Sequence, residues 1–221
     1  MGKVRDRSWM LKILEILRKE FGSMGHEAED PFELLVGTIL SQHTSDANSW
    51  RAYLNLRKSI GKITPQKLMK LGEEELSKLI WSAGLSRIKA RRLKLLSEKI
   101  LEDFGGDLKA ILEKPLDEAR RSLMKLPGVG PKTVDVVLAF SAGKPVVPVD
   151  THLFTVARRL KISDSNRYED VRAAYERLIP EDLRAEGHLL LLNLGKKYCL
   201  ARNPKCGVCP IRSLCPSYVE G

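Results

Sequence analysis

Four cysteines lie near the C-terminus, and their spacing suits one inorganic cluster. Gaps of six, two and five residues separate Cys199, Cys206, Cys209 and Cys215. Four thiolates are the usual ligand set of a [4Fe–4S] cluster. Structural zinc sites more often use paired Cys-x-x-Cys knuckles, and only Cys206 and Cys209 form one. A zinc site and a disulfide pair remain the alternatives, although thiols inside cells usually stay reduced.

A glycine-rich turn followed by a lysine is the second candidate for chemistry. Residues 126–133 read LPGVGPKT and connect two apolar segments that have helical spacing. Gly128 and Gly130 permit unusual backbone angles, and the helix that follows offers amide groups and a positive dipole end to a phosphate. An ordinary interhelical turn is the plain alternative. A nucleotide P-loop is disfavoured because Pro131 stands where that motif requires glycine.

Together with a downstream aspartate, these motifs resemble the helix-hairpin-helix DNA glycosylases, and most of all endonuclease III. The resemblance rests on residues 126–133, on Val149-Asp150-Thr151-His152 and on the cysteines, and it covers nearly the whole chain. It implies an all-α fold of two helical lobes with a DNA-binding cleft between them. Residues 29–142 would form a six-helix barrel with the hairpin, and residues 1–28 and 143–221 an iron–sulfur cluster domain.

By matching position, the resemblance gives Lys132 the role of the nucleophile and Asp150 that of the catalytic aspartate. A carboxylate stabilises the positive charge that builds on a sugar as its glycosidic bond breaks. An unprotonated lysine can attack C1′, expel the base and leave a Schiff base that permits β-elimination of the phosphate. Taken singly, Lys132 could instead be a solvated or phosphate-binding lysine, and Asp150 a helix N-cap.

Such an enzyme must flip its target base out of the duplex and fill the gap. The segment from residue 39 to residue 46 resembles the family's loop whose glutamine enters the DNA, and either Gln42 or His43 could stand there. Leu85 could be a second wedge, with a buried leucine as the simpler interpretation. The remaining expected DNA contacts come from the hairpin, namely Gly128, Gly130 and Thr133.

Helices are expected to position all of these groups. Apolar residues recur at helical spacing through residues 10–21, and Asp30-Pro31 resembles the start of another helix. The β-branched run Val146-Val147-Pro148-Val149 is short and is broken by proline, so we expect a mainly α protein. The helical pattern lapses around Gly143-Lys144-Pro145, where we expect a boundary between two lobes.

Turn residues divide the middle of the chain. Thr64-Pro65 is expected to begin a helix, and Gly72 and Gly84 to end helices. Ser86 is expected to cap a basic helix. In that helix, Leu93 and Leu96 should face inward.

Charge and composition limit the partners. The 221 residues carry a formal net charge of +10, from 38 Lys and Arg against 28 Asp and Glu. This excess indicates a polyanion, with nucleic acid favoured over membrane. No signal-peptide core or membrane span is evident. We expect an intracellular monomer, cytoplasmic or nucleoid-associated, that binds double-stranded DNA containing damaged bases or abasic sites.

These inferences predict a bifunctional DNA glycosylase and AP lyase of base excision repair. It would remove oxidised or otherwise damaged pyrimidines through a lysine Schiff base and cut the strand by β-elimination. A monofunctional uracil or thymine mismatch glycosylase is the first alternative, and such enzymes typically lack the lysine. A non-catalytic iron–sulfur module for DNA binding or redox sensing is the second.

Overall fold

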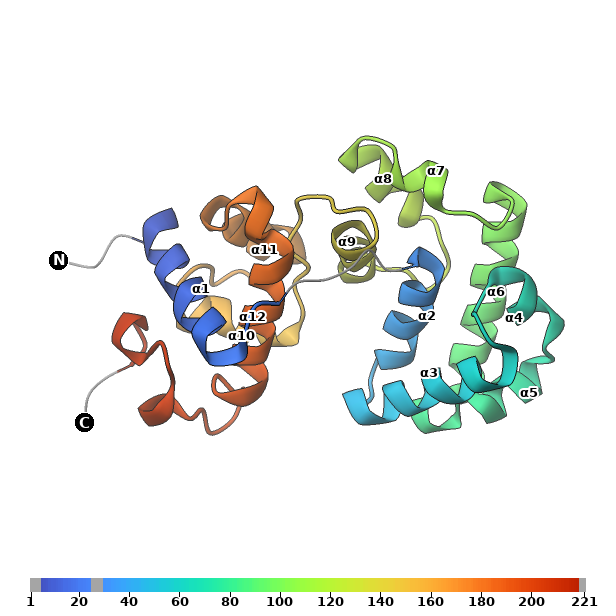
Figure 1. The fold of residues 1–221 in the computed structure, drawn as a ribbon, viewed down its shortest axis with the longest axis horizontal. Helices are drawn as coiled ribbons and strands as arrows, with labels where there is room; N and C mark the ends of the chain where they lie inside the picture. The colour runs from blue at the N-terminus through green and yellow to red at the C-terminus, as the bar shows by residue number, and fades with distance from the viewer. Residues whose placement is uncertain (1–4, 25–29, 219–221) are drawn as a thin grey trace. The chain divides into compact units, whose positions relative to one another are not determined.

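The computed structural model describes residues 5–24 and 30–218. These residues form twelve α-helices and four short 3-10 helices, with no strand among them, which confirms the all-α prediction (Figure 1). The chain divides into two compact units. We call residues 28–142 the central unit, and residues 1–27 with 143–221 the terminal unit.

The central unit contains eight α-helices and one 3-10 helix. They are α2 (Pro31–Ser41), α3 (Asp46–Ile60), α4 (Pro65–Lys70), α5 (Glu73–Leu79), η1 (Trp81–Ala83), α6 (Ser86–Phe104), α7 (Lys109–Leu112), α8 (Leu116–Leu123) and α9 (Pro131–Phe140). The long helix α6 packs against α2, α4 and α5, while α9 packs against α2 and α8. Leu93 and Leu96 of α6 are fully buried, as the sequence predicted. The expected count of six barrel helices stays a prediction.

The terminal unit combines a helix from the N-terminal part of the chain with helices from its last third. They are α1 (Arg7–Phe21), α10 (Thr151–Arg159), α11 (Tyr168–Leu178), η2 (Glu181–Leu183), α12 (Arg184–Lys197), η3 (Cys206–Val208) and η4 (Arg212–Leu214). Helix α12 packs against α1 and α10 around an apolar core. Residues 198–218 contain no α-helix, so the cysteine segment has little regular structure of its own.

Several helix ends follow from single residues. Asp30 caps α2 by accepting hydrogen bonds from the amides of Phe32 and Glu33, and Thr64 caps α4 as expected. Two predicted ends were wrong. Gly72 is the N-cap of α5 rather than a C-terminal stop, because Leu71 already ends α4.

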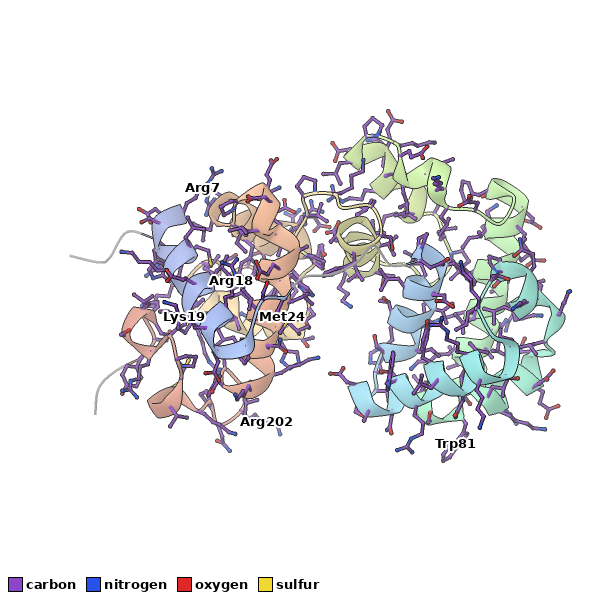
Figure 2. All side chains as sticks on the ribbon, in the orientation of Figure 1. Arg7, Arg18, Lys19, Met24, Trp81 and Arg202 are labelled. Carbon is purple, nitrogen blue, oxygen red and sulfur yellow. The ribbon has the colours of Figure 1, made fainter. Side chains whose placement is uncertain are left out.

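The N-cap of α6 is the second correction. Leu85, not Ser86, occupies that position, and Ser86 is the first helical residue. The hydroxyl of Ser86 lies 3.0 Å from the hydroxyl of Ser77. It therefore joins α5 to α6 instead of capping a helix. Trp81, just upstream in η1, projects outward from the central unit (Figure 2).

Candidate active site and DNA interface

The hairpin joins α8 to α9 and places Lys132 in the first turn of α9. Gly128 has a φ of 76°, in the left-handed region that favours glycine. A Cβ at position 128 would also lie 3.5 Å from the Arg92 side chain. Val134 makes the first backbone bond of the helix, to Gly130, so the preceding turn carries the amides and the positive dipole end that suit an anion.

Thr133 lies in the same turn, but its side chain faces inward. The residue is only 4% exposed, as expected for the buried face of an apolar helix. Any contact that it makes with DNA must therefore involve its backbone amide, which belongs to the first turn. Lys132 itself is partly exposed.

Asp150 lies in the terminal unit and begins α10. Its carboxylate accepts a hydrogen bond of 2.9 Å from the Leu153 amide, so the alternative role as an N-cap is real. The carboxylate is only partly buried and has a second oxygen that the capping bond does not use, so capping does not exclude a second role. Tyr175 supports the same turn, since its hydroxyl donates to the Leu153 carbonyl at 2.8 Å. Burial raises the pKa of Tyr175 well above 10.0, which keeps this donor protonated.

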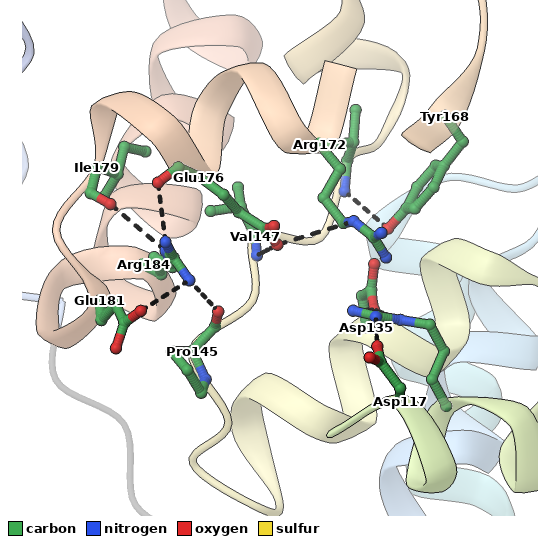
Figure 3. Close-up of polar contacts among 12 residues, drawn as sticks. Asp117, Asp135, Pro145, Val147, Tyr168, Arg172, Glu176, Ile179, Glu181 and Arg184 are labelled. Carbon is green, nitrogen blue, oxygen red and sulfur yellow. Dashed lines mark hydrogen bonds and ion pairs between the residues drawn. The ribbon is translucent and has the colours of Figure 1, made fainter. Parts of the chain in front are cut away.

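The extended segment before Asp150 is held by side chains rather than by a sheet. Arg184 donates to the Pro145 carbonyl at 2.5 Å and to the Glu176 carbonyl at 2.8 Å (Figure 3). The Val147 amide donates to the Glu176 carboxylate at 3.2 Å (Figure 3). Two helices, α11 and α12, therefore satisfy backbone groups that a strand partner would otherwise satisfy.

The last two residues before Asp150 are held in the same way. The ring of His188 lies 2.8 Å from the Pro148 carbonyl through Nδ1, and the residue is only 4% exposed. The Val149 amide donates to the Tyr168 hydroxyl at 3.3 Å. Because Pro145, Val147, Pro148 and Val149 are each anchored through a backbone group, the position of Asp150 in the terminal unit is well defined.

His152 follows Asp150 by two residues and lies against α12. A Cβ at Gly195 would lie only 2.7 Å from the Cβ of His152, which is closer than packed side chains approach. Glycine at position 195 therefore allows α10 and α12 to cross closely. This close approach gives His152 a structural role between α10 and α12.

The loop between α2 and α3 contains both candidates for insertion into DNA. Gln42 is tied to the hairpin region, because its side-chain nitrogen donates to the Gly128 carbonyl at 3.5 Å and its oxygen accepts from Arg92 at 3.2 Å. His43 has a φ of 53°, a conformation that is uncommon for a residue with a side chain. The structure thus brings Gln42 and the hairpin together.

Leu85 is exposed rather than buried, so the simpler interpretation from sequence was wrong. The residue is 55% exposed and has a φ of 50°. Exposure of an apolar side chain and a left-handed backbone each raise the free energy of the folded state. Such unfavourable features are concentrated at functional sites. Within the described part of the central unit, His43 and Leu85 are the two residues other than glycine with positive φ.

One buried lysine connects the two loops, and its burial was not predicted from the sequence. Lys89 is 1% exposed, and its ammonium donates to the Leu40 carbonyl at 2.8 Å and to the Ala83 carbonyl at 2.7 Å. Leu40 precedes the loop of His43, and Ala83 precedes Leu85. Burial, with a smaller effect of Arg92, lowers the pKa of Lys89. In sequence, Lys89 resembles the other cations of a basic helix.

All four cysteines line one cavity of about 140 Å³ in the terminal unit. Within residues 5–24 and 30–218, no three His, Cys, Asp or Glu side chains converge as a single metal ion requires. A cavity lined by four cysteines supplies the four-thiolate ligand set that a [4Fe–4S] cluster uses.

Burial dominates the electrostatics of this cavity. It raises the pKa of the Cys199 and Cys209 thiols, and an iron–sulfur cluster held there would stabilise their thiolate forms. The Arg159 guanidinium opposes that shift at Cys199, where it donates to Sγ at 3.3 Å. Arg159 also donates to the Leu200 carbonyl at 2.6 Å, which fixes the start of the cysteine segment.

Comparison with known proteins agrees with these features. Residues 36–181 match the HhH-GPD superfamily of base excision DNA repair proteins, and residues 199–215 match the iron–sulfur binding domain of endonuclease III. Over 193 residues the chain is 35% identical to endonuclease III of Thermotoga maritima, in an alignment that covers 87% of this chain and 86% of that protein. The chain belongs to the endonuclease III family.

Other members of the endonuclease III family agree over most of their length. The Bacillus subtilis enzyme is 36% identical over 215 residues, covering 93% of this chain and 92% of that protein. A solved structure of a trapped endonuclease III–DNA covalent intermediate has a TM-score of 0.82 and 30% identity, with 97% of both chains covered. The matched iron–sulfur binding domain begins at Cys199 and ends at Cys215, so it contains all four cysteines, which is consistent with a [4Fe–4S] cluster.

Proposed function

We propose that this protein is a bifunctional DNA glycosylase and AP lyase of base excision repair. It would excise oxidised or otherwise damaged pyrimidines from double-stranded DNA. The observation that carries the proposal is a lysine at the dipole end of a helix that follows a phosphate-binding hairpin, in a family that includes a trapped covalent DNA intermediate. A monofunctional glycosylase does not require a nucleophilic amine, because it forms no covalent intermediate with the sugar.

The chemistry follows from two groups. The unprotonated amine of Lys132 attacks C1′ of the damaged nucleotide, and the C1′–N bond breaks with its electron pair leaving on the base, which takes up a proton. The carboxylate of Asp150 stabilises the positive charge on the sugar as this bond breaks. The C1′–O4′ bond of the resulting aminal then breaks, O4′ takes up the proton that the amine loses, and a Schiff base forms. Loss of a proton from C2′ of the Schiff base expels the 3′ phosphate by β-elimination, and water releases Lys132.

Between the two candidates for insertion into the DNA, we favour His43. Both ends of the Gln42 amide are occupied by Arg92 and the hairpin, whereas His43 is presented by a left-handed backbone. Leu85 would be the second wedge. His43→Ala should weaken binding to a duplex with an abasic-site analogue more than it weakens binding to intact duplex. Equal losses on both duplexes would contradict insertion.

We assign gripping and flipping of DNA to the central unit, as a six-helix barrel domain, and scaffolding to the [4Fe–4S] cluster of the terminal unit. Residues 198–218 have too little regular structure to order themselves, and ligation supplies that order.

Among the described residues, no helix is long and apolar enough to cross a membrane. We expect the enzyme to act as a monomer on nucleoid DNA.

Borohydride trapping tests the proposed activity. With a duplex that contains an oxidised thymine, the wild-type protein should become covalently linked to DNA, and Lys132→Ala should abolish the link. Lys125→Ala is the matched control, because that exposed lysine lies just before the same hairpin. Base release without trapping would indicate a monofunctional glycosylase, and binding with neither would indicate a non-catalytic module.

A further inference from the structure

Trp81 is an exposed aromatic side chain that none of the roles above uses. It is 76% exposed, and two other exposed apolar residues follow it closely, Leu85 at 55% and Ile88 at 51%. Figure 2 shows its side chain directed away from the central unit. Large apolar side chains that gather on a surface usually mark a binding site.

The backbone that directly follows Trp81 is fixed by two hydrogen bonds. The Ser82 hydroxyl donates to the Asn48 carbonyl at 3.1 Å, which joins η1 to the start of α3. The ammonium of Lys89 donates to the Ala83 carbonyl at 2.7 Å. The indole is therefore presented on a backbone that is already ordered, so binding loses less conformational entropy.

Two surface grooves meet at this point, and Trp81 and Leu85 line both of them. One groove also includes Thr44 and Arg51, and therefore reaches the loop that contains His43. The other includes Lys78 and Arg87, with Glu74 as its one acidic residue. Cations on both sides of an exposed aromatic ring suit a nucleic acid, whose phosphates pair with the cations while a base stacks on the ring.

We propose that Trp81 is a further DNA-contacting residue of this enzyme. Its indole stacks on a base of the distorted duplex beside the step that Leu85 enters. The proposal rests on the proposed function, since it needs a duplex opened by Leu85. A base that loses its neighbour exposes an aromatic face, and an adjacent indole covers that face again.

Fluorescence anisotropy with a labelled duplex that contains an abasic-site analogue tests this role. Trp81→Ala should weaken binding about tenfold, the loss of one base stack, while Trp81→Phe should keep most of the affinity. Trp50→Ala is the matched control. Trp50 is 60% exposed in the same unit, but its ring stacks on Tyr53 at a centroid distance of 5.5 Å and should not contact DNA.

Tryptophan emission gives a second readout that a structural role would not change. DNA should quench emission in the wild-type protein and in Trp50→Ala, and most of this quenching should disappear in Trp81→Phe. Because Trp81→Phe keeps an aromatic ring at the surface, it controls for misfolding of Trp81→Ala.

Two results would overturn the proposal, and a third would refute the proposed function on which it rests. Normal binding by Trp81→Ala alongside weak binding by Leu85→Ala would remove Trp81 from the interface while leaving the proposed function intact. Unchanged DNA binding with loss of self-association in sedimentation would make the patch a protein interface. Failure of the wild-type protein in the trapping experiment would instead refute the proposed function.

Discussion

The two units present their functional groups in opposite ways. In the terminal unit, Asp150 follows a segment whose backbone is bound at nearly every step by side chains such as Arg184 and His188. In the central unit, His43 and Leu85 stand on short connections in left-handed conformations, and Leu85 is largely exposed.

The contrast fits the different demands on these residues. A carboxylate that stabilises a transition state must be held in place before the reaction, because reorganisation would reduce its contribution. A side chain that enters a duplex must remain on the surface until DNA arrives. Under the proposed function, the left-handed backbone at His43 and Leu85 and the anchored backbone before Asp150 serve different steps of one activity. Four variants test it, from the largest expected effect to the smallest.

Asp150→Asn should separate catalysis from helix capping. Asparagine caps helices about as well as aspartate, so the free energy of unfolding should change by less than about 1 kcal/mol. Loss of the negative charge should slow base release about 10³-fold in single-turnover kinetics. Asp6→Asn is the matched control, because Asp6 caps α1 in the same unit through the Trp9 amide. Equal activity of the two variants would make Asp150 only a cap.

Lys89→Met should destabilise the central unit and also misplace both loops. The variant leaves the carbonyls of Leu40 and Ala83 without their charged donor, which should lower the free energy of unfolding by about 2 kcal/mol. Chemical denaturation measures that loss. Affinity for abasic-analogue duplex should also fall at a temperature where the variant is folded.

Lys94→Met is the control for this second effect. Lys94 lies on the same helix and donates to three carbonyls at the end of α4, including that of Leu71 at 2.7 Å. Its loss should destabilise the protein to a similar degree without affecting the loops. If both variants bind DNA equally, Lys89 contributes only to stability.

Leu85→Gly should stabilise the protein while weakening DNA binding. Glycine removes the penalty of the left-handed backbone, and the exposed side chain loses little burial, so we expect a gain of about 0.5 kcal/mol in thermal unfolding. Leu85→Ala keeps the penalty and should gain nothing. Both should bind abasic-analogue duplex several-fold more weakly. Destabilisation by glycine would show that the conformation is not strained.

Glu186→Gln should have the smallest effect, within the terminal unit. Arg18 on α1 bonds Glu186 on α12 at 2.5 Å, and this hydrogen bond lowers the pKa of the glutamate below 4.5. The stabilisation is therefore present above pH 4.5 and disappears as the pH falls through the lowered value. We expect a decrease in Tm of about 2 °C at neutral pH and none in strong acid.

Glu15→Gln controls for a change of charge alone. Glu15 pairs with Lys19 at 2.8 Å on the same helix α1, and both side chains are mostly exposed. Its replacement should leave the Tm nearly unchanged at every pH. An equal decrease in Tm in both variants would show that the Arg18–Glu186 pair stabilises the protein no more than an exposed pair does.

The sequence by itself determined the features that depend on near neighbours. Asp30 and Thr64 could be identified as caps because a cap bonds amides only two or three residues away. The spacing of the four cysteines predicted the cluster segment. Ligands that are close together in the chain can reach one cluster in many folds, so this prediction does not require the tertiary structure. The roles of Lys132 and Asp150 came from resemblance and stay predictions.

Tertiary structure alone decided the features that depend on distant segments. In the sequence, Lys89 is one of several cations in a basic helix, and only the fold shows that its ammonium bonds carbonyls of α2 and η1. In the same way, only the fold shows that the Gln42 side chain contacts Arg92 and the hairpin. For Leu85 the sequence allowed a wedge or a buried leucine, and the structure, in which the residue is 55% exposed, decides against burial. Helical spacing predicted the burial of Leu93 and Leu96, but the burial of Lys89 and the exposure of Leu85 depend on which helices pack nearby, which residue type and spacing do not reveal.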